Sequence, residues 1–89
     1  MRVSRSYEPS HVDRDIGVRI RAARTAQGLL QPQLAALVGS SYQMVQKYEL
    51  GHSRIAVSTV VEYAQALNVP VGQLLGEIIA TAGDNDASP

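Results

Sequence analysis

Side chains capable of acid–base, nucleophilic or metal chemistry are few and widely spaced in this 89-residue sequence. The two histidines, His11 and His52, fall in an N-terminal segment without periodicity and in a loop, and the carboxylates are scattered along the chain. Neither an HExxH pattern nor a glycine-rich phosphate loop is present. The chain contains no cysteine, which excludes disulfides, thiolate zinc sites and cysteine nucleophiles. We therefore expect neither an enzyme nor a protein that holds a metal or cofactor.

The clearest spacing belongs to hydrogen-bonding side chains within residues 31–51, QPQLAALVGSSYQMVQKYELG. Small Ala35 allows two short helices to approach closely, Gly39 makes the turn between them, and Val45 holds the second helix against the first. Tyr48 follows Val45 by three positions and therefore also faces inward, before Gly51 ends the helix. The pattern predicts two packed helices whose remaining polar side chains point outward.

Apolar periodicity predicts five helices, of which this pair are the second and third. They are a helix from Asp13 up to Gly28, one over 31–38, one from about Ser41 to Leu50, one that ends at Asn68 and one that starts at Pro70. Thr59 with Glu62 resembles a capping box for the fourth helix, whose start the pattern does not fix. No segment alternates with a period of two, so we expect an all-α fold without a sheet.

The length allows one domain with one core. We expect a flexible N-terminal arm over residues 1–12, the helical domain over 13–82 and a disordered tail over 83–89. Tyr48 and Tyr63 are the largest candidates for the core, since the chain has neither Phe nor Trp. The apolar runs are too short to span a membrane and the first residues lack the apolar stretch of a signal peptide, so we expect a soluble cytoplasmic protein.

The formal net charge is zero, but the charges are unevenly placed. Six basic and two acidic residues lie between Arg14 and Arg54, a net charge of +4, whereas four acidic and no basic residues follow from Ile55 onward, a net charge of −4. Such asymmetry is typical of a molecule with one anion-facing end, although an ordinary solvated face gives the same count.

The segment from about Ile16 to Leu75 resembles the Cro/repressor (XRE-type) helix-turn-helix family of bacterial and phage regulators. The resemblance rests on the sequence AQALNVPVGQLL in the last two helices and on Gln31, Leu34, Ala35, Gly39, Val45, Tyr48, Glu49 and Gly51. It implies a five-helix lambda-repressor-like DNA-binding domain, with the third helix in the major groove of double-stranded DNA.

By position, the resemblance assigns contacts with base edges to Ser41, Tyr42, Gln43 and Lys47. Gln43 is suited to a bidentate contact with adenine, Lys47 to guanine, and Tyr42 to a thymine methyl group or a phosphate. Each assignment has a simpler alternative. Gln43 also fits a hydrogen bond at the helix end or plain solvation, and an exposed Tyr42 also fits a role in shielding the turn.

Phosphate contacts are implied for Gln31, at the start of the second helix, and for the loop residues His52, Ser53 and Arg54. The N-terminus of a helix carries partial positive charge, which suits the position of Gln31. Gln31 equally fits a cap on its own helix, and His52 a solvated loop.

A structural ion pair between Arg24 and Glu49 is the remaining implied contact, tying the first helix to the end of the third.

Three residues depart from the family pattern. Leu30 and Ala56 stand where polar helix caps are usual, and Met44 replaces a small polar residue on the outer face; the missing cap at Leu30 is expected to cost about 1 kcal/mol.

The function implied is a sequence-specific transcriptional regulator, most often a repressor, that binds a palindromic operator as a homodimer. The apolar face from Val71 to Ile79 suits either the dimer surface or the closing of the protein's own core. An antitoxin-like or other protein-binding helical module, with DNA binding secondary to a protein partner, is the alternative. Neither a membrane nor a small-molecule substrate is expected.

Overall fold

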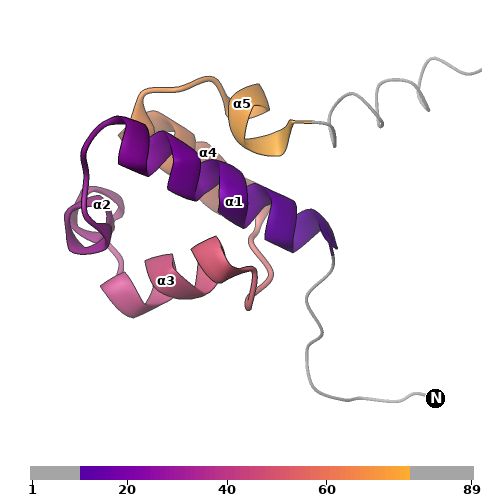
Figure 1. Ribbon diagram of the computed structural model, residues 1–89, viewed down its shortest axis with the longest axis horizontal. Coiled ribbons are helices and arrows are strands. Elements are labelled where there is room, and N and C mark those ends of the chain that lie inside the picture. Colours follow the sequence, from indigo (N-terminus) through magenta and orange to yellow (C-terminus); the bar gives the residue numbers. More distant parts are fainter. Residues whose placement is uncertain (1–10, 77–89) are drawn as a thin grey trace, which may run out of the picture.

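The computed structural model describes residues 11–76, which form five helices and no strand (Figure 1). The helices are α1 (His11–Ala26), α2 (Gln31–Val38), α3 (Tyr42–Leu50), α4 (Val57–Leu67) and α5 (Val71–Leu75). The predicted all-α class is thus confirmed. Residues 1–10 of the expected arm, the expected tail over 83–89, and Ile78 and Ile79 of the expected apolar face lie outside the described residues.

The first helix begins at His11, two residues before the expected start and inside the segment expected to be an arm. Val12 precedes Ile16 by four positions, so it extends the same apolar stripe by one turn, and it packs half-buried against the core. Asp13 lies in the first turn and is 7% exposed. A carboxylate near a helix N-terminus is favoured by the helix dipole, which supports the earlier start.

A single apolar core lies where the five helices meet. Helix α1 packs against α3 and α5, α2 packs against α3 and α4, and α4 packs against α5, with α1 lying across α4 in Figure 1. The side chains with the least exposure are Tyr63, Ile20, Leu34, Leu67, Leu74, Val45 and Val60. Burying each of the aliphatic side chains among them stabilises the fold by roughly 1.5 to 3 kcal/mol.

The two tyrosines expected in the core lie against each other. Their ring centroids are 5.7 Å apart and the rings are nearly perpendicular, at 85°. Tyr63 is 1% exposed, whereas Tyr48 on α3 is half-buried. This edge-to-face contact joins α3 to α4.

Helix α4 begins at Val57, after Ala56 in extended conformation as its N-cap. The predicted capping box of Thr59 and Glu62 is therefore wrong, because both residues lie inside the helix. Ala56 has no side-chain oxygen to accept a hydrogen bond from the first turn, as the departure from the family pattern predicted. Nothing polar in the sequence marks this helix start.

Helices α1 and α3 cross where both backbones carry glycine. A Cβ atom on Gly17 would overlap the carbonyl oxygen of Tyr48 and lie 2.8 Å from that of Glu49. At the end of α3, a Cβ atom on Gly51 would lie 2.6 Å from Cγ of Arg14. The absence of side chains at both positions lets the end of α3 lie directly on α1, and this fixes the direction in which α3 points.

Candidate nucleic-acid interface

The turn between α2 and α3 has the local geometry that its sequence predicts. Gly39 is left-handed at φ 68°, and the N–H of Ser40 donates to the carbonyl of Ala35 at 2.9 Å. Ala35 is 3% exposed, and its small side chain lets the two helices pack closely. Ser41 caps α3, its hydroxyl oxygen accepting a hydrogen bond from the backbone N–H of Met44 at 3.2 Å.

The outward face of α3, defined as Tyr42, Gln43, Gln46 and Lys47, is polar and exposed. These residues are spaced one, three and four apart, so they share one side of the helix. None of their side chains forms a hydrogen bond or ion pair with another residue in the range 11–76. Two amides, a phenol and an ammonium group together offer both donors and acceptors, as recognition of base edges requires.

Gln46 was not among the residues predicted from the sequence. It follows Gln43 by three positions and Tyr42 by four, and this spacing alone would have placed it on the same face. Met44, expected on the outer face, is instead half-buried at the side of the helix.

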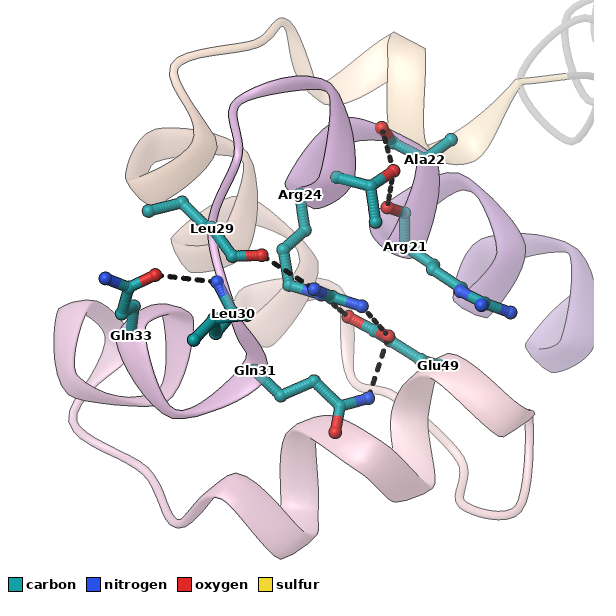
Figure 2. Close-up of polar contacts among 9 residues, drawn as sticks. Arg21, Ala22, Arg24, Leu29, Leu30, Gln31, Gln33 and Glu49 are labelled. Carbon is teal, nitrogen blue, oxygen red and sulfur yellow. Dashed lines mark hydrogen bonds and ion pairs between the residues drawn. The ribbon is translucent and has the colours of Figure 1, made fainter.

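Arg24 on α1 and Glu49 on α3 form a bidentate ion pair beneath this face (Figure 2). Nε of Arg24 lies 2.6 Å from Oε2 of Glu49, and Nη2 lies 3.0 Å from Oε1. The side chains are only 10% and 2% exposed, respectively. Nη1 of Arg24 also donates to the carbonyl of Leu29 at 2.7 Å, so one guanidinium ties together α1, the loop before α2 and α3.

Gln31, the first residue of α2, joins the same cluster. Its Nε2 donates to Oε1 of Glu49 at 3.0 Å, the oxygen that also receives Nη2 of Arg24 (Figure 2). An amide nitrogen has two hydrogens, so this bond leaves one for another acceptor. The cap before Gln31 is Leu30, whose backbone N–H is satisfied by Oε1 of Gln33 at 2.7 Å. That bond satisfies the N–H of Leu30 itself, while Leu30 offers no side-chain cap to the first turn of α2, as the departure from the family pattern predicted.

The loop predicted to follow a DNA backbone leaves the other end of α3. Gly51 is left-handed at φ 74°, and the N–H of His52 donates to the carbonyl of Lys47 at 2.9 Å. His52 and Arg54 are exposed and Ser53 is half-buried. The structure therefore places Gln31 beside the ion pair, next to Gln46 of the outward face of α3, and places His52, Ser53 and Arg54 after the helix.

No metal-binding group of three or more acidic, histidine or cysteine side chains occurs among residues 11–76. Over the same range, no helix has the length and apolarity needed to cross a membrane.

A helix-turn-helix pair inside a five-helix core, with a polar face on its second helix, defines a class of small nucleic-acid-binding domains. The chain belongs to the helix-turn-helix family HTH_3, whose model matches residues 20–74. The resemblance to XRE-type regulators is thereby confirmed.

Curated relatives are bacterial proteins named as regulators. An uncharacterized transcriptional regulator in the ATPase CF(0) region of Rhodospirillum rubrum is 43% identical over 68 residues, which cover 76% of this chain and 63% of that protein. An uncharacterized HTH-type transcriptional regulator of Sinorhizobium medicae is 38% identical over 69 residues, which cover 78% of this chain and 50% of that protein. The chain thus spans between half and two thirds of the length of these relatives.

Solved structures share the fold. The restriction-modification controller protein C.AhdI of Aeromonas hydrophila is 33% identical with a TM-score of 0.66, over 68% of this chain and 88% of that chain. The DNA-binding domain of BldD from S. venezulae is 31% identical with a TM-score of 0.67, over 74% of this chain and 99% of that chain.

Proposed function

We propose that this chain binds double-stranded DNA at a specific sequence and regulates transcription, acting as a repressor. The observation that carries the proposal is the outward face of α3. It presents Tyr42, Gln43, Gln46 and Lys47 to solvent on a helix that the core and the Arg24–Glu49 ion pair hold rigidly. A rigid helix with uncommitted donors and acceptors is what the major groove accommodates.

Each residue of this face makes a different contact with the DNA. Gln43 forms two hydrogen bonds with an adenine, Lys47 donates to a guanine, and Tyr42 contacts a thymine methyl group or a phosphate. Ser41 contributes less to recognition, because its hydroxyl oxygen already accepts from Met44. The hydroxyl hydrogen of Ser41 remains available as a donor to DNA.

Contacts with phosphates lie on both sides of this helix. Gln31 uses its second amide hydrogen, while the bond to Glu49 holds the amide in place. On the other side, His52, Ser53 and Arg54 follow the DNA backbone after α3 ends. Such contacts set the register of the protein on the duplex and carry no sequence information.

The binding unit is a homodimer on a palindromic operator. One helix such as α3 contacts only a few base pairs, whereas two domains on half-sites about one helical turn apart combine their affinities. A dimer bound in this way covers the DNA beneath it, which is how binding alone represses a promoter. The site of action is the bacterial cytoplasm, and the chain acts by binding and not by catalysis.

A protein-binding role of the antitoxin type remains the second candidate. Two exposed leucines support it: Leu30, the N-cap before α2, is 64% exposed, and Leu37, within α2, is 59% exposed. Exposed leucines suit a protein partner more than they suit a DNA backbone.

The decisive experiment is selection of bound duplexes from a random pool, followed by titration of the selected sequence. A palindromic consensus, bound by two chains and at least about a thousandfold more tightly than random duplex, supports the proposal. Equal affinity for selected and random DNA contradicts sequence-specific regulation. A complex that contains one chain contradicts the homodimer alone.

A further inference from the structure

Both histidines of the chain lie at one end of the domain, although they stand at positions 11 and 52 of the sequence. A Cβ atom on Gly51 would lie 2.8 Å from Cα of Arg14, so the end of α3 rests directly on the first turn of α1. His52 follows Gly51, and His11 precedes Arg14 by three positions. Chain geometry then limits the separation of the two histidine Cα atoms to about 14 Å. In Figure 1 the loop after α3 accordingly lies below the N-terminal half of α1.

Both imidazole rings are open to solvent. His11 and His52 are exposed, and neither side chain forms a hydrogen bond or ion pair with another residue in the range 11–76. The backbone of His52 is held in place, because its N–H donates to the carbonyl of Lys47 at 2.9 Å. The two rings are therefore available to a ligand that approaches this end of the domain.

The end of the domain that carries the histidines borders the surface proposed to bind DNA. His52 begins the loop that follows the DNA backbone in the proposed complex, and its backbone bond joins it to Lys47 of the outward face of α3. His11 extends the same surface onto α1, at the place where α1 meets the end of α3. A sugar-phosphate strand that follows this loop therefore passes both histidines.

The other charged side chains on the elements that meet here are of types that keep one charge near neutral pH. Histidine is the side chain that ordinarily gains a proton between pH 8 and pH 5, whereas carboxylates, tyrosine, lysine and arginine titrate outside that range. The charged groups concerned are Asp13, Arg14, Asp15 and Arg19 on α1, Lys47 and Glu49 on α3, Arg54 in the loop and Glu62 on α4. Proton uptake by the two histidines is therefore the change of charge that this end undergoes near neutral pH.

A proton suits an imidazole to a phosphate in two ways. It adds a positive charge, and it turns the second ring nitrogen into a donor, so that the cation offers two N–H groups. Hydrogen bonds between ionised partners are roughly twice as strong as those between neutral groups. Because the DNA backbone stays negative, the complex takes up more protons than the free protein, and its affinity rises as the pH falls.

We propose that His11 and His52 make DNA binding depend on pH, because both bind backbone phosphates as imidazolium cations. His11 thereby becomes a DNA-contacting residue on α1, outside the helix-turn-helix pair. This inference rests on the proposed function, since it needs α3 to lie in the major groove with the loop after it on the DNA backbone.

The test measures the affinity of the full chain for the duplex selected by the wild-type protein, and for random duplex, at pH 6 and pH 8 and at several salt concentrations. The variants are His11→Gln, His52→Gln and the double variant, in which an amide keeps a polar side chain that cannot take up a proton. Thermal unfolding at both pH values establishes that each variant is folded.

The wild-type protein should bind about 25-fold more tightly at pH 6 than at pH 8, each single variant about 5-fold more tightly, and the double variant equally at both. For the wild type, the slope of log K against log salt should be steeper at pH 6 by up to about two units, whereas the double variant should keep one slope. Random duplex should show the same pH dependence, because phosphate contacts carry no sequence information.

Four outcomes overturn the inference in distinguishable ways. Equal wild-type affinity at pH 6 and pH 8, with the preference for the selected duplex intact, removes the pH dependence and leaves the proposed function standing. A pH dependence that the double variant retains assigns the proton to another group. Full wild-type dependence in His11→Gln removes the contact from α1. If the wild-type protein selects no sequence at all, the proposed function fails, and the inference falls with it.

Discussion

Glu49 accepts three hydrogen bonds, and two of them come from Arg24, at 2.6 and 3.0 Å, across 25 positions of the sequence. The third comes from Gln31, so a single carboxylate joins α1, α2 and α3. Because the Glu49 side chain is only 2% exposed, removing one partner leaves the other charge poorly solvated.

Glu49→Ala should lower the free energy of unfolding by about 3 to 5 kcal/mol, because it leaves the Arg24 guanidinium buried without its counter-charge. The double variant Arg24→Met, Glu49→Leu should lose much less, since it removes both charges and keeps apolar volume. Urea denaturation of the two variants measures the difference. If the double variant is the less stable of the two, the pair contributes net stability beyond mutual neutralisation.

The helix-turn-helix pair was predictable because its limits are set by local chemistry. Gly39 and Gly51 adopt left-handed conformations that end α2 and α3, and both glycines are visible in the sequence. The hydroxyl of Ser41 likewise caps α3 in the way that its residue type predicts. These helices accordingly begin and end within one residue of the predicted limits.

Other features depend on tertiary packing and were missed. The start of α4 at Val57 has no polar cap, so Thr59 and Glu62 three residues apart gave a false signal. The bond between Gln31 and Glu49 joins residues 18 positions apart, and only the packing of α2 beside α3 brings them together. Gln46 is a different case, because the family pattern assigns no base contact to its position, whereas the helical spacing from Tyr42 and Gln43 places it on the same face.

Tyr63 should make stability fall at high pH. Burial raises the pKa of its phenol far above the ordinary 10.0, and the nearby Tyr48 and Glu49 raise it further. Below pH 10 the folded and unfolded chains both keep the proton, so stability is unaffected. Above pH 10 the unfolded chain loses this proton first, and the free energy of unfolding falls by up to about 1.4 kcal/mol per pH unit.

Tyr63→Phe removes the ionisable phenol and with it this pH dependence of stability. Its hydroxyl is buried and has no hydrogen-bond partner within residues 11–76, so the variant should be at least as stable as the wild type at pH 7. Denaturation curves collected from pH 7 to pH 11 should separate above pH 10, with the variant more stable. Parallel curves across this range contradict the assignment.

Substitution at two helix N-caps should change the stability of the fold in opposite directions. Ala56→Ser supplies a hydroxyl at an exposed N-cap that already has extended backbone, at φ −72° and ψ 152°, and should stabilise the fold by about 1 kcal/mol. Ser41→Ala removes an existing cap bond and should cost about 1 kcal/mol. Thermal unfolding at one scan rate measures both. A change of the same sign in the two variants means that capping does not control either helix end.

The two left-handed glycines that end α2 and α3 make a matched pair for testing the α1–α3 crossing. Gly39→Ala meets no atom within 4 Å and should cost only the left-handed strain, about 1 to 2 kcal/mol. Gly51→Ala has nearly the same φ but also brings its Cβ to 2.8 Å from Cα of Arg14. It should cost about 1 to 3 kcal/mol more, from overpacking. Equal costs by urea denaturation indicate that α3 shifts freely on α1.

Two further variants should distinguish recognition of bases from contact with phosphates. Gln43→Ala removes the donor and acceptor that face an adenine, so it should relax preference at one base position by about 1 to 3 kcal/mol. Arg54→Ala removes a cation from the loop after α3, so it should weaken binding to all sequences alike and lower the salt slope by about one unit. Titration of the selected duplex, of single-base variants of it and of random duplex at several salt concentrations distinguishes the two effects. If Gln43→Ala loses equal affinity for selected and random DNA, then Gln43 does not contact a base edge, and sequence preference must come from Tyr42, Gln46 or Lys47.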